Sequence, residues 1–379
     1  MLTVRKLHEN KNDLRKFIEL AFEIYKNDDK WVAPLKSDLM KTLIGTTNPL
    51  LKNGEHAYFM VFDNEKAIAR IMVGIDETLN TYTNKKHGYF ALFECYDDLQ
   101  AAKMAFDAAY DWIKERKMDK MVGPVSPTGG DDSKGVLVKG FDGPPVLLNS
   151  YNQPYYIDLY EKCGFIKYED HLAYLFKKED ILANKELVDR VEKIVERIKE
   201  RYDITIDRID LKQEDREVQS VNTIFSEGVP EGWDYTPPMT EQSVRDELKN
   251  LKSFYTNRFC FIARANGRPI GFVIGLADYN QVLIKMKGRL FPTGVFKYLF
   301  GKKKINGARI FVQFVVKDYQ NKGVNNCIFY EVYKDFMELG YDFMEGSTIG
   351  ERNLRPINAV ENMGGKLYRI YREYQKDII

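Results

Sequence analysis

The sequence predicts an α+β protein with mixed sheets, built from two similar units that a helix connects. Its 379 residues exceed the roughly 100 to 200 residues of a usual domain, so two domains are expected. The order hairpin, strand, helix, strand, helix, strand occurs on both sides of an amphipathic central segment, which predicts a sheet with helices on its faces in each unit. We therefore divide the chain into residues 1–178, a linker helix at 179–201 and residues 202–379.

The first unit opens with a helical pattern, followed by a hairpin with a polar turn at residues 63–65. Runs rich in β-branched and aromatic residues predict strands, and apolar residues repeated every three or four positions predict helices. The expected elements are a helix at 13–25, strands at 57–62, 67–75 and 89–95, a helix at 99–116, a strand at 121–125, a helix at 155–162 and a strand at 165–176.

The linker helix has an apolar face that includes Val188, Val191 and Val195. In the second unit the dipeptide Asn266-Gly267 predicts the tight turn of a hairpin. The expected elements of this unit are helices at 215–225 and 241–252, strands at 259–264, 269–276 and 310–316, a helix at 324–339, a strand at 342–348, a helix at 354–363 and a strand at 366–374.

The composition narrows the class of protein. Lys and Arg number 57 against 56 Asp and Glu, so the chain has no overall charge that would attract nucleic acid. The four cysteines are far apart, with no C-x-x-C pair and no histidine at metal-ligand spacing, which predicts neither disulfides nor a metal site. No stretch reaches the roughly 18 apolar residues of a membrane span. We expect a cytoplasmic protein without a nucleic-acid partner. The oligomeric state stays open.

The loop at residues 317–326 joins a predicted strand to a predicted helix. A helix start presents unpaired backbone N–H groups and the positive end of the helix dipole, an arrangement that suits a pyrophosphate. Gly323 allows the backbone to approach an anion, and Lys322 adds a positive charge. The same residues also fit a plain strand-to-helix turn.

Two linked motifs make residues 309–374 resemble the coenzyme A-binding half of the GNAT superfamily of acyltransferases. The signature of that superfamily on this loop is Gln or Arg, two residues, Gly, one residue, then Gly or Ala. Gln320 and Gly323 match it, and Asn325 replaces the last small residue. Asn353 and the Gly-Gly pair that follows it match the segment that contacts the pantetheine arm. The resemblance implies two GNAT-like acyl-CoA N-acyltransferase domains, of which the N-terminal one is degenerate.

The resemblance also implies a mechanism. An amine attacks the thioester of acetyl-CoA or another acyl-CoA directly, and a backbone N–H group of Val315 or Val316 stabilises the oxyanion. Asn353 would hold the pantetheine. The implied pyrophosphate site consists of Gln320, Asn321, Lys322, Gly323, Val324, Asn325 and Asn326. The expected function is transfer of an acetyl or longer acyl group to a small-molecule or peptide amine.

The usual GNAT acid, a Tyr seven residues after the pantetheine Asn, is replaced by Val360. Other side chains near the expected cleft are candidates for the acid and the base. They are Tyr368, Tyr371 and Glu361 for the acid, and Glu345 and Gln313 for the base. Of these, we predict Tyr368 and Glu345 as catalytic residues.

The N-terminal unit differs at the equivalent junction. It has no glycine, and Asp97 and Asp98 occupy the place of a pyrophosphate, so a single CoA site is expected. The Gly-, Pro- and Asp-rich stretch that follows is either a rigid connector or part of an acceptor pocket. The predicted acceptor-binding residues are Asp131, Asp132, Tyr151, Asn152 and Tyr156. Carboxylates there would suit a cationic amine.

Residues 281–304 combine seven Lys and Arg with many apolar residues and no Asp or Glu. This composition is typical of a segment that contacts a lipid surface, a long acyl chain or an acidic carrier protein, and we expect surface contact through 285–304. The cations could equally meet the phosphates of CoA. The segment also fits a lid whose apolar face packs on the sheet.

Two other functions fit the sequence. One is a non-catalytic GNAT-like module that binds CoA, in which Asn325 and Val360 mark lost chemistry. The other is a related transferase that takes its acyl group from aminoacyl-tRNA. Gln320 and Gly323 favour CoA over tRNA as the donor.

Overall fold

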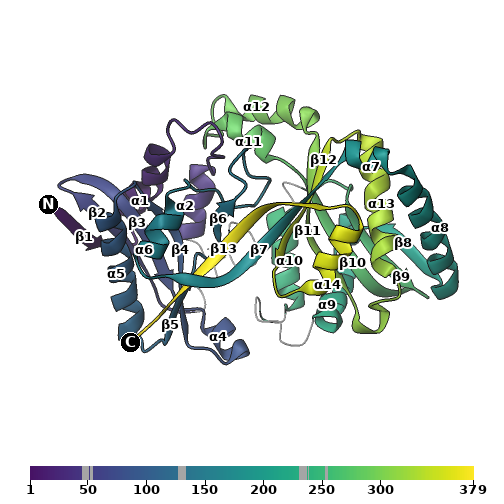
Figure 1. The fold of residues 1–379 in the computed structure, drawn as a ribbon, viewed down its shortest axis with the longest axis horizontal. Coiled ribbons are helices and arrows are strands. Elements are labelled where there is room, and N and C mark those ends of the chain that lie inside the picture. Colours follow the sequence, from purple (N-terminus) through teal and green to yellow (C-terminus); the bar gives the residue numbers. More distant parts are fainter. Residues whose placement is uncertain (45–50, 52–53, 127–133, 230–236, 238, 252–254) are drawn as a thin grey trace.

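A computed structural model describes residues 1–379 apart from 45–50, 52–53, 127–133, 230–236, 238 and 252–254. The strands form one large mixed sheet with helices packed on it, so the α+β prediction is confirmed (Figure 1). Within the described residues, no helix is both long enough and apolar enough to cross a membrane.

The N-terminal half of the chain runs from β1 to β7. Its elements are β1 (Leu2–Lys6), α1 (Lys11–Ile24), α2 (Lys36–Ile44), β2 (His56–Asp63), β3 (Lys66–Gly74), α4 (Glu77–Thr83), β4 (His87–Cys95), α5 (Leu99–Glu115), β5 (Lys120–Gly123), β6 (Val136–Lys139), α6 (Tyr156–Lys162) and β7 (Ile166–Lys177). The predicted hairpin, the long helix α5 and the last strand β7 are present at the expected positions. The short elements β1, α2, α4 and β6 were not predicted.

The C-terminal half follows two consecutive helices, α7 (Lys178–Ala183) and α8 (Lys185–Tyr202), which form the predicted linker. Its elements are β8 (Ile204–Arg208), α9 (Glu214–Gly228), α10 (Glu241–Leu251), β9 (Cys260–Ala265), β10 (Arg268–Ala277), α11 (Asn280–Met286), α12 (Gly294–Gly301), β11 (Gly307–Val315), α13 (Val324–Leu339), β12 (Phe343–Gly350), α14 (Leu354–Asn362) and β13 (Lys366–Asp377). The basic insertion is therefore largely helical, as α11 and α12.

The two halves exchange their last strands. The sheet order is β1-β2-β3-β4-β5-β13-β7-β12-β11-β10-β9-β8. β13, from the C-terminal end, pairs with β5 of the N-terminal half, and β7 pairs with β12 of the C-terminal half. β7 and β13 also pair with each other along most of their length, and in Figure 1 they cross the molecule together. The predicted division at 1–178, 179–201 and 202–379 stays a prediction, because this exchange joins both halves in one sheet.

The apolar core has a large cluster in the C-terminal half and two in the N-terminal half, the second of which packs α1 on the sheet. In the C-terminal half it lies around β9, β10 and β11 with α9 and α13, and in the N-terminal half around β2, β3 and β4 with α5. The buried face of α5 is rich in alanine, which allows this helix to pack closely on the sheet. Two smaller clusters lie on the shared strands β7 and β13, one around Ala173 and Tyr371 and one around Tyr174.

β11 and β12 separate at the centre of the molecule. They pair in parallel only from Gly307 and Phe343 to Ile310 and Gly346. Beyond these pairs, β11 continues beside β10 to Val315, whereas β12 continues beside β7. Backbone groups on the facing edges of β11 and β12 are therefore no longer joined in a ladder. This separation positions the candidate active site.

Candidate active site

A cavity of about 2870 Å³ extends from the opening between β11 and β12. Its wall includes residues of α8, α9, α10, α13 and α14, together with residues of α2, α4 and β5 from the N-terminal half. Much of the wall is apolar and includes Val221, Phe225, Phe272, Val312 and Phe314. The cavity is thus formed by both halves and reaches well beyond the loop that the sequence singled out.

The predicted pyrophosphate loop borders this cavity at the start of α13. Of the seven predicted residues, all except Lys322 line the cavity. The N-cap residue of α13 is Gly323, which has no side chain to cap the first turn, although the N–H of Asn326 already donates to the carbonyl oxygen of Gly323 at 3.0 Å. The equivalent helix α5 differs, because the Asp98 carboxylate accepts the backbone N–H of Ala101 at 2.9 Å. This contrast favours one anion site.

Gly323 has a second structural role that the sequence did not indicate. It adopts a left-handed conformation with a φ of 81°, and a Cβ atom at this position would overlap Cδ1 of Ile198 on α8. Glycine is therefore required for the close approach of the linker helix as well as for the turn. The ammonium of Lys322 lies over the rings of Tyr202 and Tyr319, at 5.6 and 4.8 Å from their centroids.

The amide side chains of the loop fix the end of β11. Gln320 Nε2 donates to the carbonyl oxygen of Val315 at 3.1 Å, and Gln313 Nε2 donates to Asn325 Oδ1 at 2.7 Å. The replacement of a small residue by Asn325 therefore adds a bond between α13 and β11. Arg355 lines the cavity from α14 and donates to Gln320 Oε1 at 3.4 Å, which makes it a cation near the loop that the sequence did not suggest.

The two predicted oxyanion donors have different surroundings. The N–H of Val316 donates to the carbonyl oxygen of Ile270 at 2.9 Å, so it takes part in the sheet. Because successive residues of a strand point their backbone groups to opposite edges, the N–H of Val315 is directed toward the opening between β11 and β12. Asn353, the predicted pantetheine ligand, lines the same cavity just before α14.

Glu345 and Tyr368, the predicted catalytic pair, are in contact with each other. Glu345 is fully buried; it accepts hydrogen bonds from the hydroxyl groups of Tyr368 and Ser347 and from Asn149 Nδ2, the last at 2.6 Å. Burial, reinforced by the charge of Glu345, raises the pKa of Tyr368. Neither residue is part of the cavity wall. Their catalytic roles stay predictions, and the geometry makes them a cluster that joins β12, β13 and the loop at Asn149.

The three described residues of the predicted acceptor pocket act as connectors. Asn152 bonds both backbone groups of Leu137, Tyr156 donates to Glu94 at 2.7 Å, and Tyr151 donates to Asp28 at 2.8 Å. None of the three lines the cavity. Asp131 and Asp132 lie outside the described residues. The acceptor role stays a prediction for all five.

Of the other candidates, Glu361 accepts a hydrogen bond from Tyr174 at 3.0 Å, and Tyr371 is buried in the sheet opposite His171. Val360 lines the cavity, at the position where the superfamily has its acid. The structure therefore places an apolar residue on the wall at this position.

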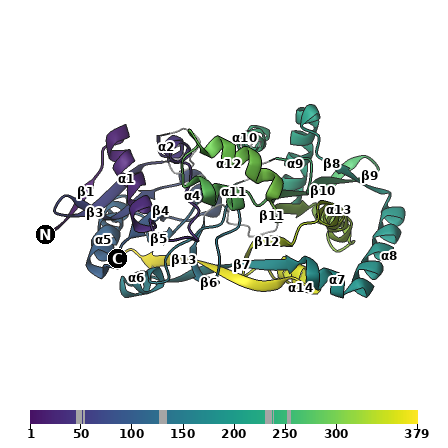
Figure 2. The same cartoon turned by 90° about the horizontal axis from the view of Figure 1, so that it is seen from above.

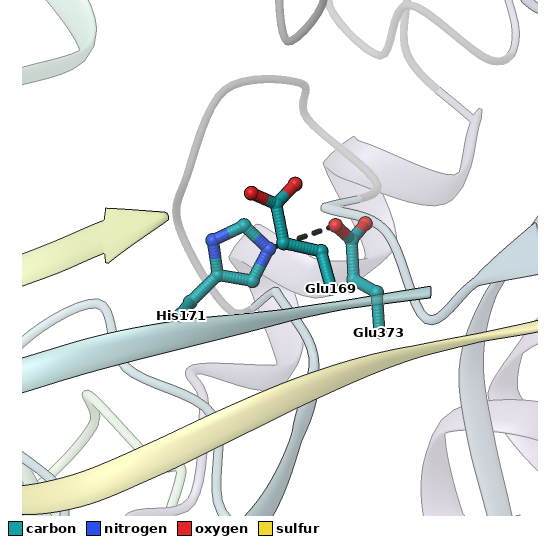
Figure 3. A group of neighbouring side chains, drawn as sticks. All are labelled: Glu169, His171 and Glu373. Atoms are coloured by element: carbon teal, nitrogen blue, oxygen red, sulfur yellow. Dashed lines mark hydrogen bonds and ion pairs between the residues drawn. The ribbon is translucent and has the colours of Figure 1, made fainter. Parts of the chain in front are cut away.

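A buried His–Glu pair on the exchanged strands was missed by the sequence analysis. His171 on β7 lies 2.8 Å from Glu373 on β13, measured from Nε2 to Oε2 (Figure 3). Glu169, two residues before His171 on β7, lies beside them. His171 and Glu373 both line the cavity. The two residues are 202 positions apart in the chain, so no local motif could have linked them.

Charges around the His–Glu pair are balanced by two cations. Lys134 Nζ lies 3.4 Å from Glu373 Oε2, and Arg352 binds Glu169 with two nitrogens at 3.0 and 2.7 Å. Burial by itself would raise the pKa of Glu373, but Lys134 and His171 outweigh it and lower this pKa below its usual value. Glu373 is therefore a carboxylate that can orient the imidazole.

The ligand atoms of Glu169, His171 and Glu373 all lie within 4.8 Å of one another, a spacing that could hold a metal ion. Both carboxylates already have a cationic partner, in Arg352 and Lys134. This pairing favours acid–base chemistry at the imidazole over metal binding.

Comparisons with known proteins agree with this architecture. No family model matches the chain. Among solved structures, a tandem GNAT protein from the clavulanic acid biosynthesis pathway covers 100% of this chain and 99% of its own with a TM-score of 0.59 at 8% identity. A GCN5-related N-acetyltransferase from Sphaerobacter thermophilus covers 100% of this chain and 96% of its own with a TM-score of 0.52 at 12% identity. The protein therefore has the GNAT fold.

Two curated proteins resemble the chain over nearly its whole length. Protein YghO of Escherichia coli strain K12 is 30% identical over 382 residues, which cover 97% of this chain and 94% of YghO. A bacterial ceramide synthase of Caulobacter vibrioides is 29% identical over 373 residues, which cover 96% of this chain and 94% of that enzyme. The chain belongs to the same family as protein YghO.

Proposed function

We propose that this protein is an N-acyltransferase that moves a long acyl group from acyl-CoA to the amine of a lipid. The observation that carries the proposal is one continuous, largely apolar cavity that reaches from the start of α13 to the His171–Glu373 pair. Small-molecule pockets usually measure about 300 to 1,000 Å³, and this cavity is nearly three times the upper value at about 2870 Å³. Such a volume exceeds the need of an acetyl group and suits long hydrocarbon chains.

The similarity to a bacterial ceramide synthase supports this choice of substrates. A ceramide is the amide of a fatty acid with a long-chain amino alcohol, so both partners of that reaction are lipids. The apolar wall would hold their chains, and burial of the chains would supply most of the binding free energy. We therefore infer that the acceptor is a long-chain amino alcohol or a similar lipid amine.

The donor would bind across the opening between β11 and β12. The uncapped start of α13 and the exposed cation Arg355 suit the pyrophosphate of CoA, and Asn353 suits the pantetheine amides. The N–H of Val315 would stabilise the oxyanion that forms when the amine attacks the thioester. Lys322 and Val316 have no direct part in this proposal, because their polar groups already have partners within the protein.

His171 would serve as the general base and then as the general acid. The imidazole of His171, which Glu373 contacts at Nε2, would take a proton from the attacking amine. The resulting imidazolium would return this proton to the departing thiolate, so that amine and thioester give amide and free thiol. This sequence uses one residue for both steps, as in other His-dependent acyl transfers. It would account for the absence of a Tyr at Val360.

Acyl-chain preference tests the proposal. The purified protein is incubated with sphinganine and either acetyl-CoA or palmitoyl-CoA, and both the free thiol and the amide product are measured. We expect amide formation with palmitoyl-CoA and at least tenfold less with acetyl-CoA, because the acetyl group would leave the apolar wall unfilled.

Calorimetry with both donors separates the alternatives. Binding of palmitoyl-CoA without turnover of any amine would support the non-catalytic CoA-binding module instead. Absence of binding to either donor would remove CoA as the donor and leave aminoacyl-tRNA as the next candidate.

A further inference from the structure

The segment formed by α11, α12 and the Lys302–Lys304 turn has two apolar faces. On the inner face, Val282 and Met286 are buried, and Leu283, Leu290 and Tyr298 line the cavity. On the outer face, apolar side chains project into solvent. A helical lid that only covers a cavity needs an apolar inner face, so the outer face requires a separate explanation.

The outer face carries the most exposed aromatic side chains of the described structure. Phe291, Phe296 and Phe300 are 75%, 63% and 72% exposed. Among the phenylalanines that the structure describes, these three are the ones with more than a third of their surface exposed, and Leu299 lies next to them at 47%. Burying such a cluster in an apolar environment would be strongly favourable.

The segment that carries this exposed aromatic cluster is also rich in cations. The seven Lys and Arg residues of the segment are all exposed, and the sequence 281–304 contains no acid. Within the described part of the chain, none of the seven forms an ion pair with a carboxylate. They are Lys285, Lys287, Arg289, Lys297, Lys302, Lys303 and Lys304. Exposed phenylalanines and exposed cations in one short segment are the combination that binds the interface of an anionic bilayer.

The position of the segment links this surface to the cavity. In Figures 1 and 2, α11 and α12 lie at the edge of the molecule next to α2, and the backbone N–H of Lys36, at the start of α2, donates to the carbonyl oxygen of Gly288 at 3.2 Å. α2 contributes Asp38, Lys41 and Thr42 to the same cavity wall. The exposed cluster and the cavity are therefore on opposite sides of one thin layer of helices.

We propose that α11, α12 and the Lys302–Lys304 turn form a docking surface for an anionic lipid bilayer. The phenylalanines insert among the acyl chains, and the cations contact the lipid phosphates. Docking would place the inner wall, with Leu283 and Tyr298, within reach of membrane lipids. The docking itself does not depend on acyl transfer, whereas delivery of a lipid to the cavity rests on the proposed function.

Sedimentation with vesicles tests the proposal directly. The full chain is mixed with vesicles of phosphatidylcholine alone, or with about one-third phosphatidylglycerol, at low and at high salt. We expect binding to the anionic vesicles that weakens as salt rises, because the cations are exposed to screening. Two groups of substitutions should each weaken binding by about tenfold or more. They are Lys302→Glu with Lys303→Glu and Lys304→Glu, and Phe296→Ser with Phe300→Ser.

Matched controls make exposed changes of the same kind elsewhere. The charge control reverses three exposed cations of α8, and the apolar control replaces two exposed residues away from the segment. These are Lys185→Glu with Lys193→Glu and Arg197→Glu, and Ile166→Ser with Leu182→Ser. The controls should bind vesicles like the original chain, and all four variants should keep its thermal unfolding midpoint.

Several results would overturn the proposal. One is no binding of the original chain to anionic vesicles. Another is equal loss of binding in the controls. A third is binding to an acidic acyl carrier protein without binding to vesicles, and a fourth is loss of CoA affinity in the Lys302–Lys304 variant with vesicle binding kept. Lack of turnover alone would count against the proposed function and leave the docking surface untouched.

Discussion

A buried carboxyl group next to the docking segment gives a prediction with a defined pH range. Asp278 joins β10 to α11 and is 4% exposed; its Oδ1 accepts the backbone N–H groups of Leu147 and Asn280 at 2.9 and 3.2 Å. Burial raises the pKa of Asp278 from its ordinary 3.8 to about 6, although the Leu147 N–H opposes this rise; the charge of Glu345 adds to it. The folded protein therefore binds this proton more tightly than the unfolded chain does.

The direction and size of the effect on the unfolding free energy follow from the difference between the folded-state and unfolded-state pKa of Asp278. Because the pKa is higher in the folded state, protonation of Asp278 stabilises the fold; this contribution is complete below about pH 4 and is lost as the pH rises through about 6. A difference of about two pKa units corresponds to about 3 kcal/mol of unfolding free energy. The substitution Asp278→Asn keeps an acceptor for both backbone N–H groups and removes the titration.

Urea unfolding at several pH values between 4 and 7 measures the effect. The unfolding free energy of Asp278→Asn minus that of the original chain should rise by about 2.4 kcal/mol from pH 4 to pH 7, since the unfolded carboxyl is already partly ionised at pH 4. The control is an equivalent change at an exposed acid, Asp246→Asn. Its unfolding free energy minus that of the original chain should not rise with pH in this way. If the Asp278→Asn difference were constant across the range, the inference that burial raises this pKa would be refuted.

Three further substitutions address the site. Replacing His171 by Gln should lower kcat by about 10²- to 10⁴-fold with unchanged acyl-CoA affinity in calorimetry, and unchanged turnover would contradict its role as the base. Replacing Gly323 by Ala should destabilise the fold by about 1 to 3 kcal/mol in urea unfolding, because the new Cβ overlaps Ile198 and the φ is positive. In a chain that already carries Ile198→Ala, the same Gly323→Ala change should cost less, and an equal cost in both backgrounds would mean that backbone strain alone is responsible. Replacing Val312 by Trp should lower the ratio of palmitoyl to acetyl transfer by about tenfold by filling the cavity, whereas Val4→Trp on the surface should leave the ratio unchanged.

Local sequence patterns predicted most of the secondary structure of this protein. The long helices α5, α8 and α13 have apolar residues at helical spacing, and the hairpins have polar turns, so each could be predicted from a short window of sequence. The short strands β1, β6 and β8 pair with strands that are distant in sequence, and they were missed together with the short helices α2 and α4. The amphipathic insertion was recognised by its composition, and the structure added its two helices.

The residues of the candidate site also differ in how far the sequence could predict them. The loop at 320–326 was found because its glycine, its glutamine and the following helix are adjacent in sequence. Glu345 and Tyr368 were chosen because they belong to strands near the expected cleft. In the structure Asn149 and Ser347 donate hydrogen bonds to Glu345, and neither Glu345 nor Tyr368 lines the cavity. The direction in which a strand side chain points depends on the register of pairing, and no local pattern fixes that.

The sequence by itself determined the order of helices and strands, the GNAT-like loop and the basic, aromatic segment at 281–304, because each of these is a property of neighbouring residues. Only the tertiary structure decided that β7 and β13 are exchanged between the halves. That exchange brings His171 beside Glu373 and joins both halves around one cavity. The physical reason is that strand pairing joins backbone groups of residues far apart in the chain, and these groups are the same in every residue except proline.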